Sequence, residues 1–393
     1  MRIFRFLFQG LLKIIFKIAF RLNPNRVFNK NNIAVPNEPV VFLCNHQNNF
    51  DAIRLRIMNN RRIAFVAHDE LYRNKFYKWI ANNLLDSICR GKTKNDISFI
   101  KNIFEAKKKG LSIGIYPEGG INYFNKSIPF DTSTAKLCKK LNLPIILVTV
   151  NGGSFLTPRW AKHKAHGKLE YTYQKLITKD ELEKLSVENL DMILKKYLYI
   201  NDYDWQRKNL VEFKRKNRAE TLDKALFICP NCFGYHGISC KNNLILCSRC
   251  HSTFILDKHD FIQSNSNITD LVQWDKFQYS KLLSDIPCLQ DNHVLLKAEN
   301  VTFNSCDATK HFSKKNLQIC NIYLYKKHLI LKTRYAEDIL SIESISKIYV
   351  EFKNTIQFNY NNLKYRISHK NIPAYVWVSY FRALNQYLKE KEA

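Results

Sequence analysis

Residues 40–51 read VVFLCNHQNNFD and are the most informative stretch of the chain. An apolar run delivers His46, and Asp51 follows five positions later, a spacing that none of the other histidines has. The pattern predicts a buried strand that ends at His46 and a helix that begins after the Asn48-Asn49 turn. The Asp51 carboxylate can then fix the tautomer of the imidazole and leave its other nitrogen free to take a proton. Taken alone, the pair is weak evidence for a catalytic role, because a histidine at a strand end is more often structural.

Two more apolar runs end in polar or glycine residues. Residues 111–116 lead into Pro117-Glu118-Gly119-Gly120, and residues 143–150 lead into Asn151-Gly152-Gly153. Open α/β sheets place their sites at such strand-to-loop junctions. The sequence therefore predicts an α/β domain whose site lies where these three strands end.

In this order and spacing the three segments resemble the glycerolipid acyltransferase family, typified by the 1-acyl-glycerol-3-phosphate acyltransferases, over residues 26–205. That family carries N-H-x-x-x-x-D, then F-P-E-G, then a proline-containing apolar strand. The resemblance implies that His46 is the base for an acceptor hydroxyl, that Asp51 orients the ring, and that the hydroxyl itself attacks a thioester. It also implies substrate contacts at Asn45, Arg90, Pro117, Glu118, Gly119 and Gly120.

The chain departs from the family after the glutamate. The family continues E-G-T-R, whereas this chain has Glu118-Gly119-Gly120-Ile121, without the arginine that helps to hold the acceptor phosphate. Lys126 is a candidate substitute. The resemblance pairs Arg90 with phosphate, where a planar guanidinium fork is favoured; the alternative is a solvated surface arginine.

The chain has 62 lysines and arginines against 34 acidic residues, a formal charge of +28, which indicates an anionic partner such as nucleic acid or a membrane surface. Residues 1–22 read MRIFRFLFQGLLKIIFKIAFRL, with basic residues along one helical stripe. Lys13 and Lys17 interrupt any apolar span long enough to cross a bilayer. We therefore predict that residues 1–25 form an amphipathic helix on the cytoplasmic face of the cell membrane, as a peripheral or monotopic anchor. The alternative is a helix that packs on the core.

Four of the eleven cysteines form two C-x-x-C pairs, separated by 14 residues. This spacing is typical of a zinc ribbon, here predicted over residues 227–256, with a hairpin between the pairs. The predicted ligands are Cys229, Cys232, Cys247 and Cys250. Four thiolates close the metal to substrate, so the predicted role of the zinc is structural.

The remaining segments complete a predicted domain plan. Residues 206–226 are predicted to form a connecting helix, and residues 257–393 a β-rich domain with a C-terminal helix. A strand meander closed by a helix is similar to the pleckstrin-homology architecture.

These features together predict a membrane-surface O-acyltransferase of phospholipid synthesis. The expected donor is acyl-coenzyme A or acyl carrier protein, and the expected acceptor is a lysophospholipid, first of all 1-acylglycerol 3-phosphate. The alternative is a catalytically vestigial lipid- or nucleic-acid-binding protein that uses the ribbon and the basic surface. The predicted ribbon contains only Lys241 and Arg249 as basic residues, which disfavours nucleic acid as the partner.

Overall fold

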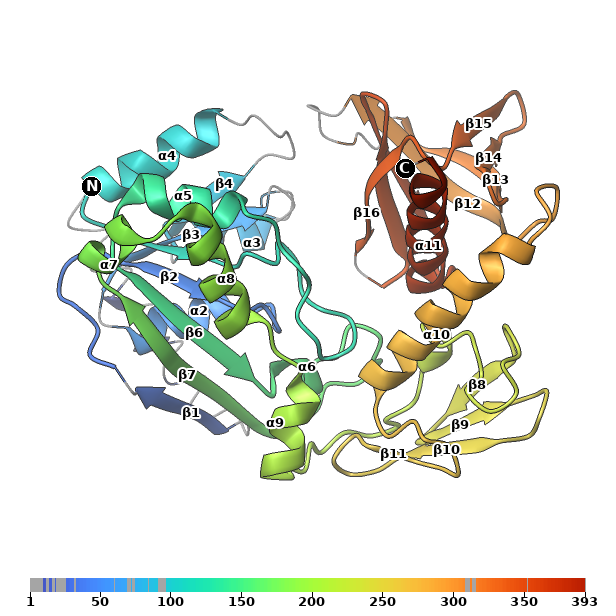
Figure 1. Ribbon diagram of the computed structural model, residues 1–393, viewed down its shortest axis with the longest axis horizontal. Coiled ribbons are helices and arrows are strands. Elements are labelled where there is room, and N and C mark those ends of the chain that lie inside the picture. The colour runs from blue at the N-terminus through green and yellow to red at the C-terminus, as the bar shows by residue number, and fades with distance from the viewer. Residues whose placement is uncertain are drawn as a thin grey trace. The chain divides into compact units, whose positions relative to one another are not determined.

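A computed structural model of the chain divides into two compact units (Figure 1). The first comprises Met1–Pro158 and Lys164–Arg215, and the second comprises Arg159–His163 and Lys216–Ala393. The structure describes residues 10–11, 14–15, 18, 26–31, 33–59, 61–68, 72, 75–83, 85–90, 97–307, 312, 316–351 and 353–392.

The first unit is built on a seven-stranded mixed sheet with the order β1-β7-β6-β2-β5-β3-β4. Its strands are β1 (Arg26–Asn31), β2 (Val41–Cys44), β3 (Ile63–His68), β4 (Ile88–Arg90), β5 (Ser112–Ile115), β6 (Ile145–Asn151) and β7 (Lys168–Ile177). Strands β6, β2, β5, β3 and β4 run parallel, whereas β7 is antiparallel to β6 and parallel to β1. The apolar runs predicted as three strands are β2, β5 and β6, so this prediction is confirmed.

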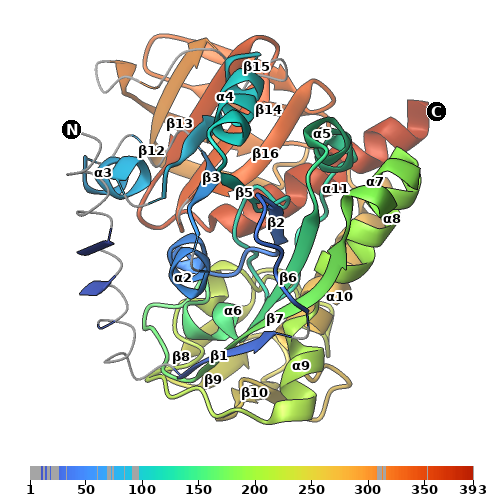
Figure 2. The same cartoon turned by 90° about the vertical axis from the view of Figure 1, so that its left-hand side faces the viewer.

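Helices cover both faces of this sheet. They are α2 (Asp51–Met58), α3 (Lys75–Asn83), α4 (Ile97–Lys108), α5 (Ser133–Leu141), α6 (Gly153–Leu156), α7 (Lys179–Lys184), α8 (Val187–Leu198) and α9 (Asp202–Asn209). Helices α5 and α8 lie on one face and α2 on the other (Figure 2). Alternate residues of β2 serve the two faces: Val41 and Leu43 join the core beneath α5 and α8, and the Phe42 ring meets the edge of Tyr173 on β7.

The second unit begins with a four-stranded antiparallel sheet in the order β11-β10-β9-β8. Its strands are β8 (Ile238–Lys241), β9 (Leu244–Cys247), β10 (Thr253–Leu256) and β11 (Ile262–Gln263). The hairpin that was predicted between the two cysteine pairs is β8 and β9, and this prediction is confirmed. Helix α10 (Leu271–Asp285) and a short 3₁₀ turn, η3 (Ile286–Cys288), lead to the next sheet.

That next sheet has seven antiparallel strands in the order β15-β14-β13-β12-β18-β17-β16, and α11 (Ala374–Glu392) packs against it (Figure 1). Its strands are β12 (Leu296–Asp307), β13 (Gln318–Leu324), β14 (His328–Lys332), β15 (Glu337–Ser341), β16 (Ile345–Glu351), β17 (Thr355–Tyr360) and β18 (Leu363–Ser368). The predicted strand meander with a C-terminal helix is confirmed. Its likeness to the pleckstrin-homology architecture stays a prediction.

The ribbon and the β-rich region share one core and are not separate units. The indole N–H of Trp274 on α10 donates to the Ile228 carbonyl at 2.9 Å, beside the first cysteine of the ribbon. The Tyr380 hydroxyl on α11 lies 3.1 Å from His236 Nε2 in the ribbon, and the two rings stack. Because α10 and α11 both contact the ribbon, its fold is tied to that of the larger sheet.

The connecting helix predicted over residues 206–226 is wrong. Helix α9 ends at Asn209, and Leu210 adopts a left-handed conformation (φ 44°) that terminates it. The following residues are held by tertiary contacts: Lys214 forms a β-bridge with His166, and the Arg218 guanidinium pairs with buried Asp260 at 3.0 Å. The only helical turn there is a 3₁₀ turn, η2 (Leu222–Lys224).

The predicted N-terminal helix lies mostly outside the described residues. Residues 10, 11, 14, 15 and 18 are helical, and the side chains of Leu11, Ile14, Ile15 and Ile18 are each at least half exposed. Within the described residues, no helix combines the length and the apolar character needed to cross a membrane.

Candidate active site

His46 and Asp51 meet at the end of β2. The His46 Nδ1 atom lies 3.1 Å from Asp51 Oδ2, and the His46 side chain is 22% exposed whereas that of Asp51 is fully buried. The parallel strand β2 ends at Cys44, and α2 begins at Asp51, so the short loop between them turns both side chains toward each other. Since Nδ1 faces the carboxylate, Nε2 is the nitrogen that remains to exchange a proton with a substrate.

The buried Asp51 carboxylate is surrounded by donors. Its Oδ2 atom also accepts the backbone N–H groups of Gln47 and Asn48, each at 2.8 Å. Its Oδ1 atom accepts the Tyr171 hydroxyl at 3.2 Å and lies 3.8 Å from the Arg54 guanidinium. A buried carboxylate remains charged only when such partners replace water. This environment therefore suits Asp51 to stabilising a charged imidazolium.

Glu118 links two of the strand-end loops. One carboxylate oxygen accepts the His46 backbone N–H at 2.8 Å, and the other accepts the Ile128 backbone N–H at 2.7 Å. Burial raises the pKa of Glu118 to about 8, although these two N–H donors act in the opposite direction. Glu118, which was predicted to shape the acceptor pocket, thus links the loop after β2 to the loop after β5 through these two hydrogen bonds.

Tyr116 and the glycine turn lie beside Glu118. Together with His46, Asp51 and Glu118 they form the His46 corner of the sheet. The Tyr116 ring lies 4.5 Å, centroid to centroid, from the His46 ring and stacks on Phe65 behind it. After Pro117 and Glu118 the chain turns at Gly119, whose φ of +65° is a left-handed conformation that glycine adopts without strain. The turn is closed by the Gly119 N–H, which donates to the Tyr116 carbonyl at 3.1 Å. Gly120 follows this turn.

The loop after β6 is fixed to the same corner. Asn45 exchanges two hydrogen bonds with the Val150 backbone, at 3.0 and 2.7 Å, so both polar atoms of its amide serve the fold. Gln47 accepts the Gly153 N–H at 2.8 Å, and buried Asp202 accepts the Gly152 N–H through both carboxylate oxygens. These contacts join three loops that are far apart in the sequence. The prediction of a substrate contact at Asn45 stays a prediction.

Arg90 stands apart from this corner. It ends β4, where its exposed guanidinium lies 5.6 Å from the Phe99 ring centroid. Strand β4 is three positions from β2 in the sheet, which at a strand spacing of ~4.8 Å is about 14 Å. An Arg90 contact would therefore fall on a part of a substrate distant from the reacting hydroxyl. Lys126, the candidate substitute for the missing arginine, has its ammonium group 5.5 Å from the Tyr199 ring centroid.

Several of these residues gave no signal in the sequence. Tyr171 and Asp202 reach the corner from β7 and α9, and no local pattern relates them to His46. Arg54 was detectable, since it stands three positions after Asp51 on α2, the spacing at which opposite charges meet on a helix.

Comparison with known proteins agrees with this geometry. Residues 26–151, which contain His46, Asp51 and Glu118, match the protein-family model described as Acyltransferase, so this segment is an acyltransferase domain. The 1-acyl-sn-glycerol-3-phosphate acyltransferase of Salmonella typhimurium is 30% identical over 118 residues, which cover 29% of this chain and 47% of that protein. The Haemophilus influenzae enzyme of the same name is 30% identical over 112 residues, covering 28% and 46%. The chain thus spans about half the length of the curated relatives it matches.

Similarity to solved structures extends over a longer segment of the chain, as one of them illustrates. The crystal structure of the 1-acyl-sn-glycerophosphate acyltransferase from Thermotoga maritima aligns with 52% of this chain and 81% of its own, with 18% sequence identity and a TM-score of 0.43.

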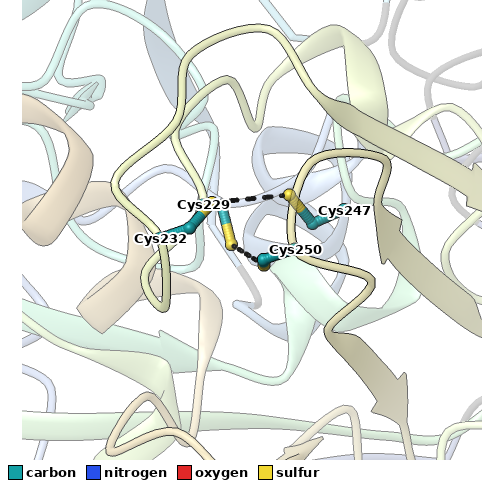
Figure 3. A group of neighbouring side chains, drawn as sticks. All are labelled: Cys229, Cys232, Cys247 and Cys250. Atoms are coloured by element: carbon teal, nitrogen blue, oxygen red, sulfur yellow. Dashed lines mark hydrogen bonds between the residues drawn. The ribbon is translucent and has the colours of Figure 1, made fainter.

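The second unit carries a candidate metal centre. The sulfur atoms of Cys229, Cys232, Cys247 and Cys250 all lie within 4.8 Å of one another, and two of the pairs are 3.7 Å apart (Figure 3). Four sulfurs bound tetrahedrally at about 2.3 Å from zinc would stand about 3.8 Å apart, so the donor set and its spacing fit this ion. Cys240, in the same hairpin, is outside the cluster.

Proposed function

We propose that the first unit transfers a fatty acyl group from a thioester donor, acyl-coenzyme A or acyl carrier protein, to the hydroxyl of a lysophospholipid. The observation that carries this proposal is the His46–Asp51 hydrogen bond, in an acyltransferase domain, at the ends of the parallel strands. The first acceptor to test is 1-acylglycerol 3-phosphate, because the enzymes of Salmonella typhimurium and Haemophilus influenzae are named for it.

The proposed reaction needs one base and no protein nucleophile. His46 Nε2 takes the proton of the acceptor hydroxyl as its oxygen attacks the thioester carbonyl, and Asp51 stabilises the imidazolium that forms. The tetrahedral intermediate collapses by breaking the carbon–sulfur bond. The leaving thiolate takes the proton from the imidazolium, so the products are an ester and a free thiol and the imidazole is neutral again.

The proposal includes a structural zinc and a membrane location. The four clustered cysteines would hold zinc in the second unit, where it takes no part in acyl transfer. The half-exposed apolar side chains of Leu11, Ile14, Ile15 and Ile18 support an anchor within residues 1–25 on the cytoplasmic membrane face.

The test is complementation of a strain with conditional loss of its 1-acylglycerol-3-phosphate acyltransferase, followed by lipid analysis. The chain should restore growth and diacylated product, and His46→Ala should abolish both. His293→Ala is the matched control, because His293 is an exposed histidine in the second unit. Near-normal transfer by a folded His46→Ala protein would refute the mechanism.

The alternative, a vestigial lipid- or nucleic-acid-binding protein, is favoured by one observation: Ile121 stands where the family has its phosphate-binding arginine. The alternative predicts that the unaltered chain binds anionic vesicles or duplex DNA but transfers no acyl group to any lysophospholipid.

A further inference from the structure

A groove opens on the first unit where the loop that follows Glu118 meets α8. Its volume is about 440 Å³, and it is lined by Pro129, Phe130, Met192, Lys195, Lys196 and Tyr199. Met192, Lys195, Lys196 and Tyr199 follow one another at spacings of three, one and three residues, so they share one helical face. The reaction described above assigns this groove no role.

The groove is joined to the candidate active site by direct hydrogen bonds. Glu118 accepts the N–H of Ile128, the residue before Pro129 in the groove wall. The neighbouring Ser127 hydroxyl donates to the Leu198 carbonyl at the end of α8 and accepts the Ile200 N–H, both at 3.1 Å. Glu118, which positions the His46 loop, therefore also fixes the wall of the groove through its hydrogen bond with Ile128.

The groove is apolar inside and cationic at its rim. Met192 is 61% exposed and Tyr199 is 46% exposed, and both line the groove with Phe130, so they form one contiguous apolar surface. Lys195 and Lys196 extend from the same face, and both are exposed. The Lys195 ammonium pairs with Asp191 at 2.6 Å yet remains 47% exposed, so it can still contact an anion.

Other cations gather at this rim. Hydrogen bonds from Ser133 hold the pKa of Asp131, the residue after Phe130, below its usual value, and Arg90 and Lys195 act in the same direction. Lys126 lies over the Tyr199 ring. Lysines beside exposed aromatic and aliphatic side chains are typical of surfaces that lie in the headgroup region of anionic membranes.

We propose that this groove is a lipid-contact site: it seats an acyl chain of an anionic bilayer phospholipid against Phe130, Met192 and Tyr199, while Lys195 and Lys196 bind the headgroup phosphate. The site would set the mouth of the active site against the membrane that supplies the acceptor. This inference rests on the proposed function, since only a bilayer-borne acceptor requires such a contact.

The test compares two forms of the acceptor in the full-length protein. One is long-chain 1-acylglycerol 3-phosphate in mixed vesicles of neutral and anionic phospholipid, and the other is a short-chain analogue that is monomeric in water. Met192→Glu and the double variant Lys195→Gln/Lys196→Gln should each lower the rate on vesicles about tenfold, because the first places a charge on the apolar surface and the second removes two cations that attract anionic lipid. Their rates on the soluble acceptor should remain within about twofold of the unaltered protein, because no reacting group has changed.

Binding and control measurements complete the design. Vesicle sedimentation should show weaker binding of the lysine variant to anionic vesicles and unchanged binding to neutral ones. Lys179→Gln/Lys184→Gln is the matched control, because it removes two exposed lysines from α7 in the same unit. Thermal unfolding verifies that each variant is folded.

The outcomes separate the two proposals. Unchanged rates and unchanged vesicle binding in the groove variants would overturn the lipid-contact site, as would equal losses on both acceptors in folded variants. A groove that instead bound a partner protein would give the first of these results. If the unaltered chain acylates neither acceptor, the proposed function fails. The sedimentation measurements alone then show whether the groove binds anionic lipid.

Discussion

The candidate active site and the cysteine cluster are both small groups of side chains, but the chain supports them differently. The His46 corner is fixed by protein alone: Asp51, Glu118, Asn45 and Gln47 all bond backbone groups from two or three loops. The cysteine cluster is carried by loops beside short strands of four residues, and its four sulfur atoms face one another within 4.8 Å. The comparison indicates that the reaction site is preorganised by the core, whereas the cysteine cluster is arranged to be held together by the proposed zinc.

The largest expected effect comes from removing the charge at the centre of the preorganised corner. Asp51→Asn keeps the size of the side chain but cannot stabilise an imidazolium, and its amide must turn an N–H toward one of the present donors. We expect kcat to fall by about 10³-fold or more, with KM little changed. Steady-state kinetics measures this. A folded variant with kcat within tenfold of the unaltered protein would contradict the role of Asp51.

The second prediction concerns the proposed zinc site. Cys247→Ser should reduce the zinc content to near zero and open the ribbon to protease, because thiolate ligation and local folding are coupled. Acyl transfer to the soluble acceptor should continue, since the corner in the first unit contains no ligand of the cluster. Cys240→Ser is the control, as Cys240 lies in the same hairpin outside the cluster. Elemental analysis and limited proteolysis measure the effect; equal zinc in both variants would refute the site.

The sequence predicts those parts of the fold whose signals are local. The apolar runs of β2, β5 and β6, the five-residue step from His46 to Asp51 and the paired cysteines can all be detected within a few residues. The contacts that support the corner cannot be detected in this way. Tyr171 is 120 positions from Asp51, and Asn45 is 105 from Val150, so only the folded sheet brings them together.

Two of the elements of the second unit that were not predicted differ in the signal that they carry in the sequence. Strand β15 (Glu337–Ser341) is a short edge strand with acidic residues, so it lacks the apolar alternation that indicates a strand. Helix α10 did carry a signal. Asp270 is an N-cap that accepts the Gln273 N–H, and Trp274 and Leu282 fall on one buried stripe two turns apart. The error over residues 206–226 arose because charged residues favour helix by propensity, while Leu210 and the Arg218–Asp260 pair determine the real path.

The third prediction concerns the titration of Glu118. Glu118 has a pKa of about 8 in the folded protein, above its ordinary value of 4.5, so the folded state binds the extra proton between these two pH values. The free energy of unfolding should therefore decrease as pH rises from about 4.5 to about 8, by at most about 5 kcal/mol for this group.

Glu118→Gln should flatten this slope. It should also lower kcat about tenfold, because an amide can accept only one of the two backbone N–H groups through its carbonyl oxygen. Urea unfolding at several pH values measures the slope. Asp202, whose burial raises its pKa to about 7, contributes a slope of the same sign in both proteins, so the difference between them isolates Glu118. Identical slopes would contradict the assignment.

The smallest predicted effect concerns the hydrogen bond from Tyr171 to Asp51. Tyr171→Phe removes the hydroxyl that donates to Asp51 Oδ1 at 3.2 Å and leaves the ring in place. A buried neutral donor to a charged acceptor contributes about 1.5–3 kcal/mol, of which only the part that changes in the transition state affects the rate. We therefore expect kcat to fall about fivefold. The control is Tyr173→Phe, two residues along the same strand, whose hydroxyl accepts from the Asn59 amide at 2.7 Å and does not touch Asp51. Both variants lose buried hydrogen bonds of a tyrosine hydroxyl on the same strand, and urea unfolding measures the stability that each loses, but only Tyr171→Phe should lower kcat. Equal kcat values in the two variants would mean that Tyr171 supports the fold and not the reaction.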